Sequence, residues 1–205
     1  MLIGSKIQLT SATVLMALVS ARTGATILGR SSGEAICDGA EVVSSTTISV
    51  NGKEVVHTTY SCPSIARRGI ICRLLGICPT KPKPAPTDLP TYVCDQLCDY
   101  VCSDPNPLPP ITEDCGVIQD AIQIYEGSIA PTFVVDASSI EQLTYGTCRF
   151  FFENLSSAPL EYCWTSLSSI ASSGETACFP PVQPVQSQAL CIPSTGAWEV
   201  GVGHS

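Results

Sequence analysis

Residues 42–60 read VVSSTTISVNGKEVVHTTY, two runs rich in β-branched residues on either side of Asn51-Gly52. Asn-Gly adopts the two positive φ angles of a type I′ turn, a turn well suited to joining antiparallel strands. The β-branched flanks favour an extended backbone on either side of that turn. The stretch therefore predicts a β-hairpin, and because an isolated hairpin is only marginally stable in water, we expect a staple to support it.

Cysteines lie on both sides of this hairpin and recur along the rest of the chain. Cys37 and Cys62 flank the hairpin and are placed to join its ends, although spacing alone leaves all pairings open. The chain has 12 cysteines, and a large, even number is typical of a disulfide framework formed in an oxidising compartment. We expect disulfides at Cys37, Cys62, Cys72, Cys78, Cys94, Cys98, Cys102, Cys115, Cys148, Cys163, Cys178 and Cys191.

The N-terminus, residues 1–21, has the pattern of an export signal. One positive side chain, Lys6, precedes the uncharged apolar run 7–20, and small residues before Ala21 suit cleavage there, with Ala25 as the alternative site. The run has about 14 residues, fewer than the roughly 20 that a transmembrane helix needs. We therefore expect a secreted, extracellular protein with no membrane insertion.

A proline-rich linker, residues 79–90, divides the mature chain into two parts. It holds five prolines in 12 positions, which precludes a regular helix or strand ladder. The cysteine-containing hairpin segment, residues 22–78, together with the linker has a formal charge of +3, whereas residues 91–205 carry 13 acidic side chains and one cation, Arg149. Arg67-Arg68 is open to two interpretations, a dibasic processing site or a solvated pair on a loop.

The part after the linker alternates helical and extended patterns. Thr112 is suited to cap a helix that ends at Gly127, and Ser157 and Pro159 begin a second helical pattern that ends before Gly174. This order predicts a small, disulfide-rich α+β domain with an antiparallel sheet. The expected strands are 131–135, 143–152, 188–192 and 197–202.

Composition and motifs argue against several classes of function. Ten Lys and Arg against 18 Asp and Glu make a nucleic-acid binder a poor fit, because that binding depends on cationic side chains. A catalytic triad needs an imidazole base, and the two histidines, His57 and His204, lie in different parts of the chain. A zinc site at Cys94, Cys98 and Cys102 lacks a nearby fourth ligand, so we expect disulfides there, and no enzyme, metal or cofactor.

A rigid, acidic β surface with aromatic side chains suits the binding of neutral sugars. The alternation in 143–152 predicts that Tyr145, Thr147 and Arg149 share one face, and Glu199 lies on the open side of the last strand. These four are the candidate glycan-binding residues, with an ordinary sheet face as the alternative interpretation. The sequon Asn154-Leu155-Ser156 predicts a glycosylated surface turn.

Four motifs in residues 94–205 resemble a family of cysteine-rich lectins secreted by mushroom-forming fungi, the ink-cap lectin type. They are Asp114-Cys115-x-x-Ile118, Leu143-Thr144-Tyr145-Gly146-Thr147-Cys148, Tyr162-Cys163-x-x-Ser166 and Gly196-x-Trp198-x-Val200-x-Val202-x-His204.

The resemblance implies an αβα sandwich, a homodimer that extends one sheet across two subunits, and binding of complex glycans without cleavage. The alternative functions are a secreted effector or inhibitor that recognises a protein partner, or a structural protein of the wall or fruiting body.

Overall fold

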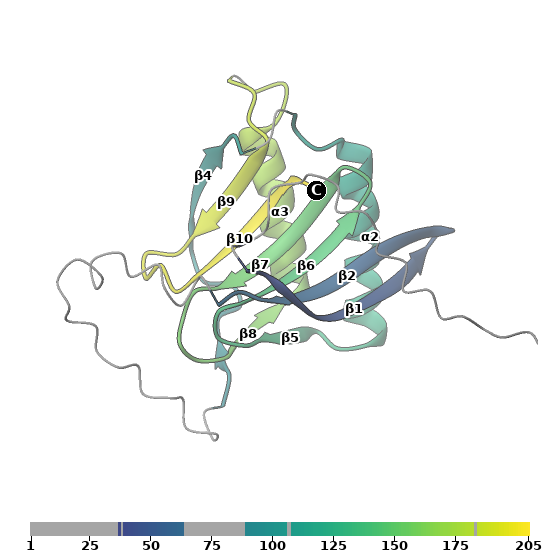
Figure 1. Ribbon diagram of the computed structural model, residues 1–205. Helices are drawn as coiled ribbons and strands as arrows, with labels where there is room; N and C mark the ends of the chain where they lie inside the picture. Colours follow the sequence, from purple (N-terminus) through teal and green to yellow (C-terminus); the bar gives the residue numbers. More distant parts are fainter. Residues whose placement is uncertain (1–36, 38, 64–88, 106–107, 183) are drawn as a thin grey trace, which may run out of the picture. The chain divides into compact units, whose positions relative to one another are not determined.

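The computed structural model describes residues 37, 39–63, 89–105, 108–182 and 184–205 (Figure 1). These residues form a seven-stranded antiparallel sheet, a three-stranded sheet and two helices, which confirms the predicted disulfide-rich α+β fold. Other predictions lie outside the described residues. They are the export signal 1–21, the Arg67-Arg68 pair, residues 79–88 of the linker, Cys72 and Cys78.

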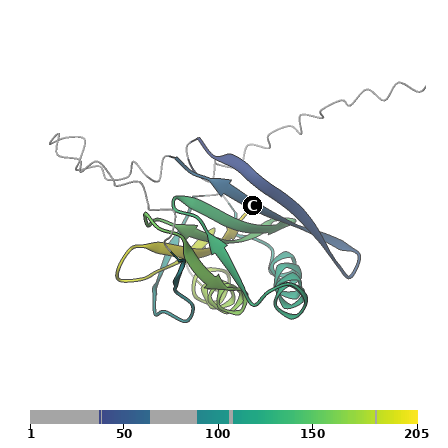
Figure 2. The ribbon, with the colours of Figure 1, turned by 90° about the horizontal axis from the view of Figure 1, so that it is seen from below.

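The large sheet has the strand order β1-β2-β6-β7-β10-β9-β4. In that order the strands are Glu41–Val50, Lys53–Ser61, Ser139–Tyr145, Cys148–Asn154, Trp198–His204, Gln188–Ile192 and Asp99–Ser103. The small sheet has the order β3-β8-β5, with strands Thr91–Tyr92, Leu160–Cys163 and Thr132–Val135. Helices α2 (Thr112–Ser128) and α3 (Trp164–Cys178) lie on the same side of the large sheet (Figure 2). Neither described helix is long and apolar enough to cross a membrane.

The predicted hairpin is present as β1 and β2. Asn51 and Gly52 have φ angles of 51° and 78°, as the type I′ turn requires, and a disulfide joins Cys37 to Cys62 at the hairpin's open end. Strand β2 also pairs with β6 from Val56 to Ser61. The hairpin thus extends the same sheet as the C-terminal part and covers the edge that β6 would otherwise expose.

The predicted long strand 143–152 is instead the second half of β6, a tight turn and most of β7. Gly146 has a φ angle of 55°, and this left-handed conformation reverses the chain where the alternation alone suggested continuous extension. Because Tyr145 now pairs directly with Cys148, the two side chains lie on the same face of the sheet. The prediction that Tyr145 shares a face with Arg149 is therefore wrong.

The second helix begins and ends later than predicted. Residues 160–163 form strand β8, which pairs with β3 and β5, so the helix begins at Trp164. Gly174 lies inside the helix rather than beyond its end. A Cβ atom at this position would stand 2.9 Å from the Ala189 Cβ, so glycine allows α3 to pack closely on the sheet.

All ten described cysteines form disulfides. Besides Cys37–Cys62, the pairs are Cys94–Cys163, Cys98–Cys191, Cys102–Cys178 and Cys115–Cys148. Two of these cysteines, Cys94 and Cys98, precede β4, and Cys102 lies in it. Each of the three is paired with a cysteine far away in the sequence. Cys94–Cys163 and Cys98–Cys191 therefore fasten the segment before β4 to β8 and β9, and Cys102–Cys178 and Cys115–Cys148 fasten α3 and α2 to the large sheet.

The main core lies between the helices and the large sheet. Phe150, Phe152, Trp198, Val200 and Val202 project from β7 and β10 into it, each at most 1% exposed. The strand alternation places Phe151 on the opposite face, where it joins a smaller cluster with Ile140 and the Cys37–Cys62 bridge.

Candidate functional site

The four predicted glycan-binding residues do not form one site. Tyr145 lies on the helix-facing side of the sheet, where the Lys53 ammonium is 5.6 Å from its ring centroid. Arg149 and Glu199 lie on the opposite face, four positions apart along neighbouring strands. The Arg149 guanidinium stands 5.3 Å from the Phe151 ring centroid.

Thr147, the fourth predicted residue, fastens the sheet to α2. Its backbone N–H and its hydroxyl both donate to Asp114 Oδ2 at 2.8 Å, and its Oγ1 accepts from the Ile111 N–H at 2.8 Å. The adjacent Cys148 is bonded to Cys115, next to Asp114. The Asp-Cys and Gly-Thr-Cys motifs thus join the start of α2 to the start of β7. These contacts of Thr147 and Cys148 stabilise the fold.

Replacing Gly146 with alanine should test this junction. A Cβ atom there would lie 2.3 Å from Asp114 Oδ2, and the φ angle of 55° disfavours side chains, so we expect a loss of about 3 kcal/mol in the free energy of unfolding. Gly196→Ala is the matched control. Gly196 has a φ of 61° but open space around its Cα, and should lose about 1 kcal/mol on denaturation. Equal losses for both variants would show that the Asp114 contact contributes nothing.

Asn154 is not on the surface, as the sequon suggested, but fully buried at the end of β7. Its Nδ2 donates to the carbonyl oxygens of Val135, Asp136 and Ala158 at 2.9, 3.1 and 2.9 Å. Its Oδ1 accepts from the backbone N–H and the hydroxyl of Ser156. The surface placement is therefore wrong, because the atom that would carry a glycan is enclosed by the loops it connects.

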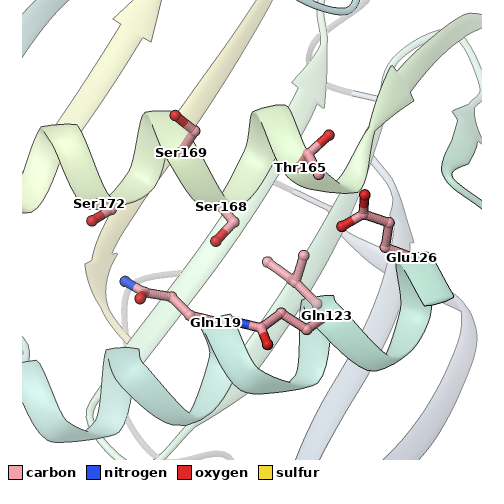
Figure 3. Close-up of a pocket in the computed structure, with 8 residues that line it drawn as sticks. Gln119, Gln123, Glu126, Thr165, Ser168, Ser169 and Ser172 are labelled. Carbon is pink, nitrogen blue, oxygen red and sulfur yellow. The ribbon is translucent and has the colours of Figure 1, made fainter.

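A polar groove of about 300 Å³ lies between α2 and α3 (Figure 3). The helices run antiparallel, so Glu126 of α2 faces Thr165 of α3 at one end, whereas Gln119 faces Ser172 at the other. The lining residues are Gln119, Ile122, Gln123, Glu126, Thr165, Ser168, Ser169 and Ser172.

The chemistry of this groove follows from the spacing of polar residues along the helices. Gln119, Gln123 and Glu126 recur every three or four positions of α2, and the hydroxyls of α3 do the same, so each set forms one stripe. The short side chains of α3 leave space between the helices. The groove therefore presents amide and hydroxyl groups and a single carboxylate, above a buried Ile122.

Glu175 continues the α3 stripe just beyond Ser172. Burial raises the pKa of its carboxyl to about 7, and the neighbouring Gln119 side chain partly offsets that rise. Its Oε1 is buried without a hydrogen-bond partner among the described residues. A carboxyl group at this end of the helix pair is therefore partly protonated near neutral pH.

Glu175 should make stability depend on pH. A carboxyl whose pKa is raised by folding stabilises the protein below its unfolded pKa, and that contribution is lost as pH rises through the folded pKa. We expect the free energy of unfolding to fall between pH 4.5 and about 7, and Glu175→Gln to flatten this dependence by on the order of 1 kcal/mol. Urea titrations across that range provide the measurement. A pH dependence that persists unchanged in Glu175→Gln would assign it to other groups.

A second polar cluster, the His57 junction, comprises His57, Thr59, Tyr125, Glu141 and Trp164. His57 Nε2 is hydrogen-bonded to Glu141 Oε1, and its Nδ1 lies 2.9 Å from the Tyr125 hydroxyl. The Thr59 hydroxyl donates to Glu141 Oε2 at 2.8 Å. Tyr125 and Trp164 stack with centroids 4.7 Å apart. Sequence reasoning set His57 aside because it precedes the linker, and no motif links it to a glutamate 84 positions away.

Comparison of the chain with protein-family models, curated proteins and solved structures found no match. Within the described part of the chain, no group of three or more His, Cys, Asp or Glu side chains is arranged to hold a metal ion. The function must therefore be argued from the chemistry of the groove and of the surface.

Proposed function

We propose that the protein is a secreted lectin, of the type that mushroom-forming fungi produce, and that it binds a neutral glycan in the α2–α3 groove without cleaving it. The observation that carries this proposal is the lining of the groove, where seven of eight residues are polar and only Glu126 is charged. Two disulfides, Cys102–Cys178 and Cys115–Cys148, support it further, because a site on helices fixed to a sheet is organised before the ligand arrives.

Neutral sugars match this lining better than other small ligands do. Each sugar hydroxyl both donates and accepts hydrogen bonds, as do the amides of Gln119 and Gln123 and the hydroxyls of Ser168 and Ser172. Glu126 adds acceptors for a pair of hydroxyls. An anionic ligand would be repelled by that carboxylate, and a strongly apolar one would leave these polar groups unpaired.

A glycan array with the full-length oxidised protein tests the proposal. We expect selective binding that free sugar competes and that changes little with ionic strength, because the contacts are between neutral groups. Gln123→Ala should weaken binding about tenfold, since it removes hydrogen bonds to the ligand. Asp120→Ala, an exposed change on α2 outside the groove, is the control. Unaltered glycan mass after incubation would agree with binding without cleavage, and an array with no binding would refute the lectin proposal.

A protein partner is the second candidate, and a specific observation favours it. The described residues include 15 acidic side chains but only two Lys or Arg, Lys53 and Arg149. Such a surface suits a cationic partner, as expected of a secreted effector or inhibitor. This binding would weaken steeply with salt and would resist competition by sugar, in contrast to the lectin.

A second copy of the chain, in a homodimer, is the remaining expected partner. The hairpin occupies the edge of β6, so the edges of the large sheet are β1 and β4. A second copy that extends the sheet would pair along one of them. Light scattering tests this arrangement, and a monomer at high concentration would exclude it.

A further inference from the structure

The groove and the His57 junction adjoin each other along both helices. Tyr125 immediately precedes Glu126, and Trp164 immediately precedes Thr165, the two residues that face each other at one end of the groove (Figure 3). Successive helical residues point about 100° apart, so the two rings face the sheet while Glu126 and Thr165 face the groove. Tyr125 and Trp164 are 6% and 3% exposed, which confirms their inward orientation.

The stacked rings set the separation of the two helices at this end. They contribute one ring from each helix, with an interplanar angle of 20°. A packed interior cannot take up a changed ring position without a shift of the attached backbone. The width between Glu126 and Thr165 therefore depends on how this ring pair is held.

His57 holds the ring pair from the sheet side. Its ring meets Tyr125 and Trp164 edge-on, at 5.2 and 5.4 Å between centroids and interplanar angles of 81° and 80°. Both ring nitrogens are engaged, one by the Tyr125 hydroxyl and one by Glu141 on β6, so the imidazole has a fixed orientation. The His57 side chain is 16% exposed and that of Glu141 is 8% exposed.

We propose that His57, a residue of the N-terminal hairpin, is a positioning residue for the Glu126–Thr165 end of the groove and thereby sets its affinity for ligand. The affinity part rests on the proposed lectin function, whereas the positioning part concerns the unliganded protein. The hairpin then has two roles. It extends the sheet, and it fixes the geometry of a groove to which it contributes no lining residue.

The test compares His57→Gln with Thr58→Val in the full-length oxidised protein. Glutamine retains a donor for Glu141 but has no ring to contact Tyr125 and Trp164. Thr58 is the neighbouring buried residue of the same strand, and its side chain points to the opposite face. His57→Phe is the second variant, which keeps a ring but loses both hydrogen bonds, so a folding failure of either variant leaves the other informative.

Backbone amide chemical shifts of the unliganded protein are the first readout. We expect His57→Gln to shift the amides of Glu126 and Thr165 while those of Gln119 and Ser172 stay near their wild-type positions. Thr58→Val should shift neither pair. Equal shifts at both ends of the groove, or none at all, would overturn the positioning proposal irrespective of ligand.

Titration with N-acetyllactosamine, as a neutral sugar probe, is the second readout. We expect His57→Gln to bind about tenfold more weakly than the wild type and Thr58→Val to bind equally well, within the range that indirect substitutions produce. Equal affinity of His57→Gln and wild type would overturn the affinity part. If the wild type binds neither this sugar nor any glycan on the array, the lectin proposal fails. The amide shifts alone then decide whether His57 positions the groove.

Discussion

Replacing Asn154 with alanine will lower the free energy of unfolding by about 3 to 4 kcal/mol, because each hydrogen bond typically contributes about 1 kcal/mol and the abandoned groups remain buried. The side chain is fully buried and donates to three carbonyl oxygens in two separate loops. Its removal deprives the carbonyls of Val135 and Asp136 of this donor in a place that water cannot readily enter, whereas the Ala158 carbonyl keeps the Ser156 hydroxyl. Chemical denaturation of the purified variant measures the loss.

Two further measurements separate the hydrogen bonds from simple loss of volume. Asn154→Asp has nearly the same shape but cannot donate to the carbonyls, so it should destabilise the protein at least as much as alanine does. Ser156→Ala removes a hydroxyl that donates to Asn154 Oδ1 and to the Ala158 carbonyl, but keeps all three bonds of Asn154 Nδ2, and should cost about 1 to 2 kcal/mol. The peptide that contains Asn154 should also have its unmodified mass when the protein is expressed through the secretory pathway of a eukaryotic host. A glycan found on that peptide, or a loss below 1 kcal/mol for alanine, would contradict the burial.

Local sequence patterns predicted the elements that depend on neighbouring residues. The Asn51-Gly52 turn needs only its own two φ angles and its extended flanks, and β1 and β2 formed as expected. The first helix, 112–127 by sequence, is present as α2 over Thr112–Ser128, although its N-cap is Ile111, so the prediction that the Thr112 side chain caps it is wrong. In these segments the residues that determine the structure are adjacent in the chain, so the pattern is sufficient.

The errors arose where distant contacts decide the conformation. Pro159 and the following apolar residues have a helical pattern, yet pairing with β5 and β3 makes residues 160–163 a strand. A glycine such as Gly174 often marks the end of a helix, but here glycine is needed because α3 packs closely against Ala189 across the core. The sequon at Asn154 predicts a surface position because glycosylation motifs are recognised locally, whereas its burial depends on loops that end at Val135 and Ala158.

The candidate site was the least predictable feature. The groove needs two helices, one ending at Ser128 and the other beginning at Trp164, to present their polar stripes to each other, and no single segment contains that information. Its residues are glutamines and serines, which are common on any solvent-exposed helix. The His57 junction depends likewise on the pairing of β2 with β6, which the Pro-rich linker gave no reason to expect.

Removing the Cys115–Cys148 bridge by a double substitution to alanine should lower the free energy of unfolding by about 5 kcal/mol, the upper part of the usual range. Both sulfurs lie in the main core with 0% exposure, so their loss leaves a cavity where α2 meets β7, as well as freeing the unfolded chain. The Asp114–Thr147 and Ile111–Thr147 hydrogen bonds remain between these segments. Denaturation of the oxidised variant gives the value.

The Cys102–Cys178 bridge supplies the contrast that identifies the cause. It closes a sequence separation of 76 residues against 33 for Cys115–Cys148, so loop-closure entropy alone predicts that its removal costs about 0.7 kcal/mol more. Only one of its two cysteines, Cys178, lies in the main core, whereas Cys102 is exposed on the edge strand β4, so removing this bridge leaves a smaller cavity than removing Cys115–Cys148. We expect the Cys115–Cys148 variant to be the less stable of the two, because packing in the folded state outweighs the difference in loop length. The reverse order would show that the disulfides act mainly on the unfolded chain, and that the junction between α2 and β7 is held well enough by Asp114.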